Sequence, residues 1–143
     1  MTIIRSANAM WEGNLQQGKG SVSVESGLIS NANYSFSKRF GEEAGTNPEE
    51  LLAAAHAACF SMALSAGLSG ANYKVNSVKT VDKVTLEKVD GGFKITKIDI
   101  HCDASVEGAS NEEFQKIATD TKAGCPISKA LTGVEFVLHA KLN

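Results

Sequence analysis

The sequence predicts an α+β fold, in which strands near both ends of the chain flank one long apolar helix. Between Leu51 and Leu68 the chain carries no formal charge. The segments before and after this stretch show the period-two alternation that is typical of strands. The tripeptide Asp90-Gly91-Gly92 separates two such segments and is a strong hairpin signal. For a chain of 143 residues we expect a single domain, 1–143.

Strands are expected first in the N-terminal part of the chain. Residues 3–11 and 21–25 alternate loosely, and the polar segment 13–20 between them is turn-like. Residues 34–40 alternate more strictly, which predicts a third strand with its aromatic side chains on one face. Arg39 would then lie at the end of that strand, on the opposite face.

A helix is expected to begin at Pro48, which suits the first helical position. Asn47 before it is a good N-cap, and Glu50 completes a pattern that resembles a capping box. The apolar run that follows is long enough to raise the question of a membrane span. It is mostly alanine, contains several polar residues and has no flanking basic anchors, so we predict the buried central helix of a core or a dimer.

The C-terminal half predicts two further strands and two helices. Residues 73–89 and 93–106 form the expected hairpin. Residues 111–122 are amphipathic, and a short helix follows Cys125. Residues 134–140 close the chain as a strand.

Composition indicates an ordinary soluble protein, with 43% hydrophobic and 21% charged residues and a net charge of −2. The absence of a block of like charges argues against binding to nucleic acid or to a membrane surface. The first residues lack the apolar core of a secretory signal, so we expect a cytoplasmic protein.

The chain contains three cysteines, Cys59, Cys102 and Cys125. A secreted disulfide framework usually has more cysteines than this and an even number of them. No CxxC pair is present, which argues against a zinc ribbon and a thioredoxin motif. In a reducing compartment a transient catalytic disulfide is the better interpretation of any cysteine pair. Cys102 shares a strand face with Ile98 and Ile100, so we assign it to packing.

Cys59 and Cys125 are the candidate reactive thiols. A cysteine in an apolar helix, such as Cys59, more often simply packs. Cys125 directly precedes Pro126, near the start of a helix, where backbone N–H groups and the helix dipole favour a thiolate. Together the two residues are the parts of a thiol-based redox site.

Arg39 and Glu49 are the charged residues that could serve such a thiol. Arginine beside a thiol lowers its pKa, and a carboxylate can hold the guanidinium in a bidentate pair. Glu50 already serves the helix cap, whereas Glu49 is spare. On one helix Glu49 lies about 15 Å from Cys59 along the axis. If both serve one site, a dimer partner must supply one of them.

His56 lies three residues before Cys59 and is its neighbour on the helix surface. A Cys–His nucleophile pair and a Cys/His metal site are therefore alternatives. No third orienting group is evident for a hydrolase, and His101 and His139 lack metal-type spacing. We expect His56 to be a core histidine with its hydrogen bonds satisfied.

Taken together, these residues resemble the OsmC/Ohr family of thiol-dependent peroxidases, and most closely its OsmC (osmotically inducible protein C) branch. The resemblance covers nearly the whole chain, including an opening Ala-x-Trp-Glu-Gly. The motifs that carry it are Arg39-Phe40, Thr46–Leu51, Ala54–Phe60 and Gly124–Ser128.

The resemblance implies a role for each candidate. Cys59 matches the peroxidatic cysteine and Cys125 the resolving cysteine. Glu49 matches the glutamate that positions the site arginine, which in the OsmC branch is Arg39. Ohr proteins usually carry tyrosine at the position of His56. The resemblance also implies an intertwined homodimer, a long central helix packed against antiparallel-rich sheets, and neither metal nor flavin as cofactor.

The implied reaction is the reduction of an organic hydroperoxide to an alcohol and water, an antioxidant function in oxidative or osmotic stress. Cys59 becomes a sulfenic acid, and Cys125 traps it as a disulfide. An external dithiol then reduces the disulfide, a role that lipoylated proteins fill for related Ohr proteins. Two alternatives remain, a non-catalytic dimeric structural protein and a Cys/His metal-binding module.

Overall fold

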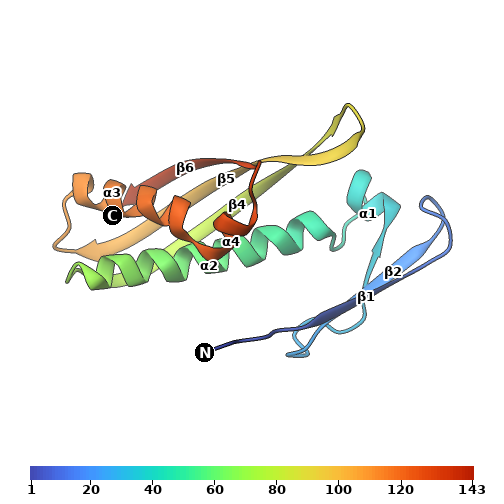
Figure 1. Cartoon of the computed structure of the whole chain (residues 1–143), viewed down its shortest axis with the longest axis horizontal. Helices are drawn as coiled ribbons and strands as arrows, with labels where there is room; N and C mark the ends of the chain where they lie inside the picture. Colours follow the sequence, from blue (N-terminus) through green and yellow to red (C-terminus); the bar gives the residue numbers. More distant parts are fainter. The chain divides into compact units, whose positions relative to one another are not determined.

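The computed structural model describes residues 1–143. It contains helices together with two three-stranded sheets (Figure 1). This confirms the predicted α+β class. The chain divides into two compact units, Met1–Leu51 and Leu52–Asn143, which are described in turn. The expectation of a single domain over 1–143 stays a prediction.

The first unit contains an antiparallel sheet in the order β1-β2-β3, with β1 at Ala7–Glu12, β2 at Lys19–Val24 and β3 at Ala32–Ser35. Gly20 lies in the central strand, opposite Trp11 on one side and Tyr34 on the other. A Cβ atom at this position would lie 2.5 Å from the Tyr34 ring and 2.8 Å from the Trp11 ring. The glycine therefore allows the two aromatic rings to close over the strand, with centroids 5.5 Å apart.

The predicted strand over residues 34–40 is wrong beyond Ser35, because helix α1 occupies Phe36–Phe40. Ser35 caps this helix, and its side chain accepts a hydrogen bond from the Lys38 amide. The rings of Phe36 and Phe40 pack on each other one turn apart, with centroids 4.9 Å apart. Arg39 therefore projects from a helical turn and not from a strand end.

Helix α2 runs from Pro48 to Gly70 and begins where the sequence predicts. Asn47 accepts a hydrogen bond from the Glu50 amide at 2.9 Å, as an N-cap does. By length and composition alone this helix could cross a membrane, yet one of its faces belongs to the hydrophobic core. The side chains that are fully buried on that face are His56, Phe60, Leu64 and Leu68.

The expected burial of α2 on all sides is not met within one chain, where 22% of its most apolar stretch is buried. The face opposite the core is exposed at every fourth residue, at Ala54, Ala58, Met62 and Ala66.

The second sheet has the order β4-β5-β6, with β4 at Lys74–Val89, β5 at Gly92–Glu107 and β6 at Glu135–Leu142. The predicted hairpin joins β4 and β5, with Gly91 and Gly92 at positive φ in the turn. Strand β6 pairs with β5 in the parallel direction. A parallel neighbour requires a crossover, which the two remaining helices provide.

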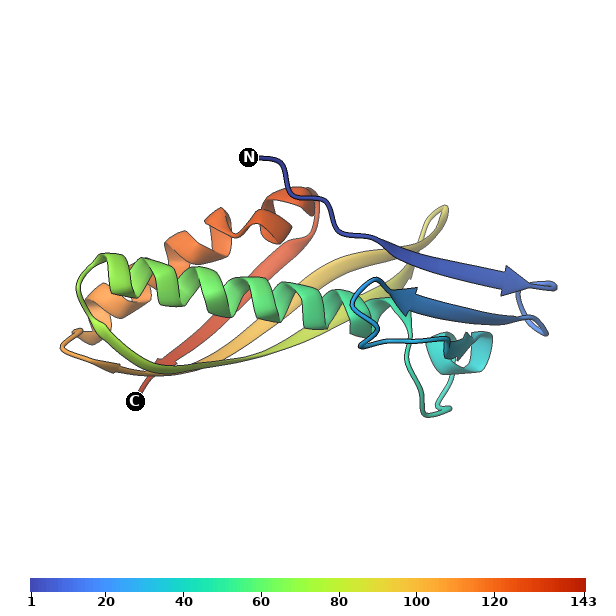
Figure 2. The same ribbon diagram turned by 90° about the horizontal axis from the view of Figure 1, so that it is seen from below.

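These helices are α3, Asn111–Gly124, and α4, Pro126–Ala130. A capping box between Ser110 and Glu113 starts α3. Helices α2 and α3 lie side by side on one face of the sheet (Figure 2), where a Cβ at Gly67 would come within 3.0 Å of Ile117. Side chains from α2, α3 and β5 form the buried core of this unit.

Candidate active site

The packing of the second unit brings two thiols together. Cys59 lies midway along α2, and Cys125 is the residue between α3 and α4. Both cysteines are free, and their Sγ atoms are 2.6 Å apart. Cys125 is fully buried, whereas Cys59 is partly exposed. A partly exposed thiol in contact with a buried one is suited to react first with an external molecule and then with its neighbour.

The surroundings of the two thiols differ in their effect on charge. Burial raises the pKa of Cys59, and the hydrogen bond with Cys125 raises it further. Burial also opposes a charge on Cys125, but the hydrogen bond with Cys59 and interactions with the backbone of Ser128 and Ile127 outweigh it and lower the Cys125 pKa. None of the groups that act on Cys59 in this unit is a cation. A Cys59 thiolate therefore needs a positive charge from elsewhere.

The first unit contains a positively charged side chain, Arg39, whose orientation is fixed by an ion pair. The Arg39 Nε lies 3.2 Å from both carboxylate oxygens of Glu49, and its Nη2 lies 2.7 Å from Oε1. Glu49 is 9% exposed, so the ion pair is largely shielded from solvent on the carboxylate side. The guanidinium also lies over the Phe40 ring, 5.1 Å from its centroid. Arg39 and Glu49, both predicted from the sequence, are thus brought together.

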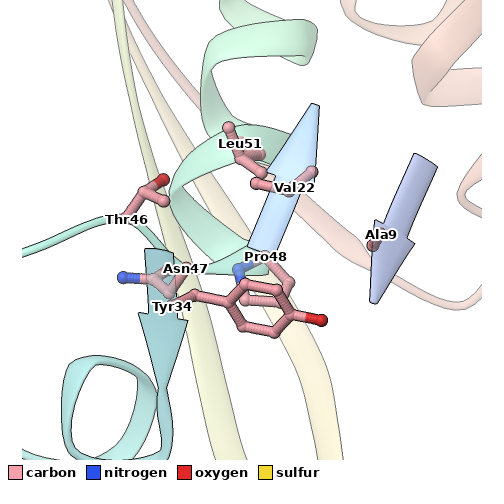
Figure 3. Close-up of a pocket in the computed structure, with 7 residues that line it drawn as sticks. All are labelled: Ala9, Val22, Tyr34, Thr46, Asn47, Pro48 and Leu51. Atoms are coloured by element: carbon pink, nitrogen blue, oxygen red, sulfur yellow. The ribbon is translucent and has the colours of Figure 1, made fainter. Parts of the chain in front are cut away.

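Two hollows of the first unit are lined by apolar groups. One, of about 420 Å³, is bordered by Arg39 and contains several aromatic and aliphatic side chains, Trp11, Leu15, Tyr34, Phe36 and Phe40. The other, of about 220 Å³, lies at the start of α2, and Tyr34, Pro48 and Leu51 are among the residues that line it (Figure 3). Its lining contains neither a cysteine nor a charged side chain.

The third cysteine has a structural place. Cys102 is 2% exposed and belongs to the same core cluster as Ile98 and Ile100, which agrees with its predicted packing role. Burial raises the pKa of the Cys102 thiol, and a hydrogen bond with the Thr80 side chain only partly offsets this rise. No group of three or more His, Cys, Asp or Glu side chains is arranged to hold a metal ion.

His56 is fully buried and both of its ring nitrogens have partners, which confirms the satisfied core histidine. Nε2 lies 2.8 Å from the Ser128 hydroxyl, and Nδ1 contacts the Asp82 carboxylate. Neither partner was predicted, because they lie 72 and 26 residues away in the sequence. The sequence does contain a signal that Asp82 is buried. In β4 the alternation of side chains places Asp82 on the same face as Val78 and Val84, which pack against the core.

Comparison with known proteins agrees with this architecture. Residues 41–139 match the sequence profile of the OsmC-like protein family. The chain is 50% identical over 143 residues to Peroxiredoxin OsmC of Escherichia coli (strain K12), covering 100% of this chain and 99% of the relative. It is 33% identical over 101 residues to the organic hydroperoxide resistance protein OhrB of Bacillus subtilis (strain 168), covering 69% and 72% of the two chains.

Solved structures show the same fold. The crystal structure of OhrB of Bacillus subtilis superposes with a TM-score of 0.70 at 27% identity, covering 95% of this chain and 98% of the other. An organic hydroperoxide resistance protein from Elizabethkingia anophelis gives a TM-score of 0.75 at 26% identity, with both chains fully covered. The chain therefore belongs to the OsmC family. With this full-length identity to a peroxiredoxin, it is a cysteine-based peroxidase.

Proposed function

We propose that this peroxidase reduces organic hydroperoxides to alcohols, using Cys59 as the attacking thiol and Cys125 as the resolving thiol. The observation that carries the proposal is the contact between the two free thiols, 2.6 Å apart, with only Cys59 partly exposed. Relatives named as organic hydroperoxide resistance proteins support the substrate class.

The reaction proceeds in two thiol steps. The Cys59 thiolate attacks the distal oxygen of ROOH, the O–O bond breaks, and the alcohol leaves after taking up a proton. Cys59 is then a sulfenic acid. The Cys125 sulfur attacks the Cys59 sulfur, water departs, and a disulfide forms. An external dithiol, such as the lipoyl group of a lipoylated protein, reduces this disulfide. We place the protein in the cytoplasm, where thiols are kept reduced.

Arg39 is proposed to supply the positive charge that Cys59 lacks in its own unit. The bidentate pair with Glu49 aims the guanidinium and restricts its motion. By the helical rise, Glu49 lies about 15 Å along α2 from Cys59 of the same chain. We therefore assign the Arg39–Glu49 pair of one protomer to the Cys59 of its partner in a homodimer.

Burial in the isolated chain supports a homodimer. Within residues 1–51 no hydrophobic side chain is buried, so this unit lacks a core of its own. The face of α2 opposite the core is also uncovered, and Met62 at its middle is 76% exposed. Small side chains four residues apart on that face allow a second helix to approach closely. A second copy of the chain would cover both surfaces at once.

The substrate class predicts a preference that can be measured. With dithiothreitol as reductant, we expect kcat/KM for cumene hydroperoxide to exceed that for hydrogen peroxide by about tenfold or more. Burial of two methylene-sized groups in the apolar hollow beside Arg39 is worth about 1.6 kcal/mol, which corresponds to that factor. Peroxide consumption at several concentrations gives both constants. Equal values for the two peroxides, or a preference for hydrogen peroxide, would refute the organic substrate class.

The proposed role of Arg39 predicts a change in thiol ionisation. Loss of the guanidinium in Arg39→Ala should raise the Cys59 pKa, because a positive charge close to the thiolate no longer favours it. Alkylation of Cys59 at pH 7 should slow by about tenfold or more, since the thiolate fraction falls about tenfold per pKa unit. Glu49→Ala should act in the same direction but less strongly, because the arginine remains and only its aim is lost.

Iodoacetamide labelling of Cys59, followed by mass spectrometry over a range of pH, measures this effect. Lys38→Ala is a suitable control, since it removes a cation from the same helical turn without touching Glu49. An unchanged pH profile in Arg39→Ala would show that this arginine is not the partner of the thiolate.

A further inference from the structure

Two pairs of side chains join helix α2 to the segment that contains α4. In the thiol pair, the Sγ atoms of Cys59 and Cys125 are 2.6 Å apart. In the second pair, His56 Nε2 and Ser128 Oγ lie 2.8 Å apart and share a hydrogen bond. We call His56 and Ser128 the anchor pair. On each side of the interface the two members are three residues apart, about one helical turn, so the anchor pair lies next to the thiol pair.

The imidazole of the anchor pair is held in one orientation. His56 is fully buried, and its ring lies against that of Phe136, with centroids 5.1 Å apart. Its Nδ1 contacts the carboxylate of Asp82 on β4, whose side chain is 0% exposed. Partners at both ring nitrogens and an aromatic ring on one face leave the imidazole little freedom to turn. Nε2 is therefore fixed toward Ser128, which is 8% exposed.

The burial of Asp82 is unfavourable by itself and indicates what these polar groups do. Its Oδ2 contacts His56, whereas its Oδ1 has no hydrogen-bond partner. Burying a carboxylate that is incompletely hydrogen-bonded opposes folding, and apolar side chains of similar volume avoid that cost. The best-attested benefit of buried polar groups is that they specify one register between packed elements. The line from Asp82 through His56 to Ser128 joins β4, α2 and α4 in one register.

Helix α4 depends on such a contact for its position. It has five residues, Pro126–Ala130, and a helix of that length is not stable on its own. Cys125, between α3 and α4, has a ψ of 131°, so the chain changes direction there and α3 does not determine where α4 lies. No side chain caps the start of α4. The anchor pair is the side-chain hydrogen bond that attaches α4 to α2.

Cys125 is coupled to α4 through the backbone. Its C=O accepts a hydrogen bond from the Lys129 N–H at 3.0 Å, which ties it to the first turn of the helix. Its N–H donates to the Thr121 C=O at 2.9 Å, at the end of α3. Cys125 and Ser128 thus belong to one short hydrogen-bonded turn. A shift of Ser128 along α2 therefore also shifts the Cys125 sulfur relative to Cys59.

We propose that the anchor pair positions Cys125 for the resolving step, so that the disulfide closes before a second hydroperoxide reaches Cys59. The inference rests on the proposed function, because it concerns one step of that reaction. His56 and Ser128 are positioning residues, and Asp82 fixes the imidazole. The thiol pair changes chemically in every turnover, whereas the groups of the anchor pair do not react. The anchor pair therefore holds the segment around Cys125 in place while Cys59 is a sulfenic acid.

Two reactions compete for the sulfenic acid of Cys59. In closure, the sulfur of Cys125 bonds to that of Cys59, the S–O bond breaks, and the hydroxyl group leaves with the thiol proton as water. In overoxidation, a second ROOH transfers an oxygen atom to the Cys59 sulfur, which gives a sulfinic acid and ROH. Thiols do not reverse that product. Closure is fast only if the two sulfurs are well placed, since a displacement of about 1 Å can cost about 100-fold in rate.

Timing the two thiol steps separately tests the role of the anchor pair. Wild-type and Ser128→Ala protein receive one equivalent of cumene hydroperoxide, and acid-quenched samples are analysed by mass spectrometry. We expect Ser128→Ala to form the Cys59 sulfenic acid at the wild-type rate, because attack on the peroxide does not involve Cys125. Closure to the Cys59–Cys125 disulfide should slow by about tenfold or more. Equal slowing of both steps, or closure at the wild-type rate, overturns the inference.

A second pair of variants removes the hydroxyl at constant volume. Ser128→Thr and Ser128→Val have side chains of nearly the same shape, but only threonine can make the hydrogen bond to His56. Closure should be about tenfold faster in Ser128→Thr than in Ser128→Val. Equal closure rates in these two variants overturn the inference, even where Ser128→Ala is too unstable to assay. Ser61→Ala is the matched control, since it removes a hydroxyl of α2 that is bonded to Thr80 at 2.7 Å, and should leave both steps unchanged.

The redox equilibrium distinguishes positioning from a direct effect of the hydroxyl on the closure rate. Wild-type and Ser128→Ala protein are equilibrated with glutathione buffers of different ratio, without peroxide, and the disulfide fraction is measured by alkylation and mass spectrometry. Two thiols that are held together form their disulfide more readily, so the equilibrium constant for the Cys59–Cys125 disulfide should fall about tenfold in Ser128→Ala. This corresponds to a reduction potential about 30 mV less negative. An unchanged potential overturns the inference.

Overoxidation provides a third readout during turnover. With dithiothreitol and excess cumene hydroperoxide, the fraction of Cys59 converted to sulfinic acid per turnover should rise about tenfold in Ser128→Ala, in proportion to the slower closure. Wild-type levels of sulfinic acid in this variant overturn the inference and leave the proposed function intact. Absence of a Cys59–Cys125 disulfide in oxidised wild-type protein overturns the proposed function itself, which distinguishes the two failures.

Discussion

Cys59→Ser protein is expected to consume no hydroperoxide above the rate of the dithiol alone. A serine hydroxyl is not appreciably ionised at neutral pH, so no nucleophile remains at the position that attacks the peroxide. The contact with Cys125 cannot compensate, because Cys125 is fully buried. Peroxide consumption with dithiothreitol measures this, and turnover comparable to wild type would exclude Cys59 as the peroxidatic residue.

Cys102→Ser is the matched control for that experiment. Cys102 lies in the core on β5, and its hydrogen-bond partner is Thr80. It should keep nearly full peroxidase activity, with at most a modest loss of stability from placing a hydroxyl among apolar neighbours. This control separates the loss of a reactive thiol from the loss of any cysteine.

Mixed dimers of two inactive or weakened parents are expected to recover activity. If each site takes Cys59 from one protomer and Arg39 from the other, a dimer of Cys59→Ser with Arg39→Ala has one intact site. Its activity should reach about half that of wild type, since one of the two symmetric sites is whole. Co-refolded proteins carrying different affinity tags, purified in two steps, provide verified mixed dimers for the assay.

The reverse pairing is a control with the opposite expectation. A dimer of wild type with the double variant, Cys59→Ser and Arg39→Ala in one chain, has no intact site if sites are shared between protomers. It keeps one intact site if each chain builds its own. Activity in this dimer together with none in the first would show that Arg39 and Cys59 of one chain act together.

Elements with local signals could be predicted from the sequence. The start of α2 follows from Asn47 and Pro48, which cap a helix without help from the remainder of the chain. The β4–β5 hairpin follows from the turn glycines Gly91 and Gly92, whose positive φ values the turn requires. Both are decided by a few adjacent residues.

Helix α1 shows where local patterns are ambiguous. In Phe36–Phe40 the aromatic residues fit strand alternation, but they also lie one helical turn apart. The Ser35 cap favours the helix and decides between the two. The change from strand to helix does not alter the partner of Arg39, because this residue still forms its ion pair with Glu49.

Contacts between distant residues could not be predicted from composition or periodicity. The pairing of Cys59 with Cys125 was suggested by family resemblance, and the partners of His56 were not expected at all. Asp82 and Ser128 reach His56 only after β4 and α4 pack against α2. The parallel pairing of β6 with β5 is likewise a product of the crossover through α3 and α4.

The most direct test of the account is to identify the product of a single oxidation. Wild-type protein is treated with one equivalent of cumene hydroperoxide without reductant, its remaining thiols are alkylated, and its peptides are mapped under non-reducing conditions. We predict a Cys59–Cys125 disulfide with Cys102 alkylated, and in Cys125→Ser a Cys59 that carries one added oxygen. A Cys59–Cys102 disulfide, or Cys59 alkylated as a free thiol after the peroxide has been consumed, would contradict the mechanism.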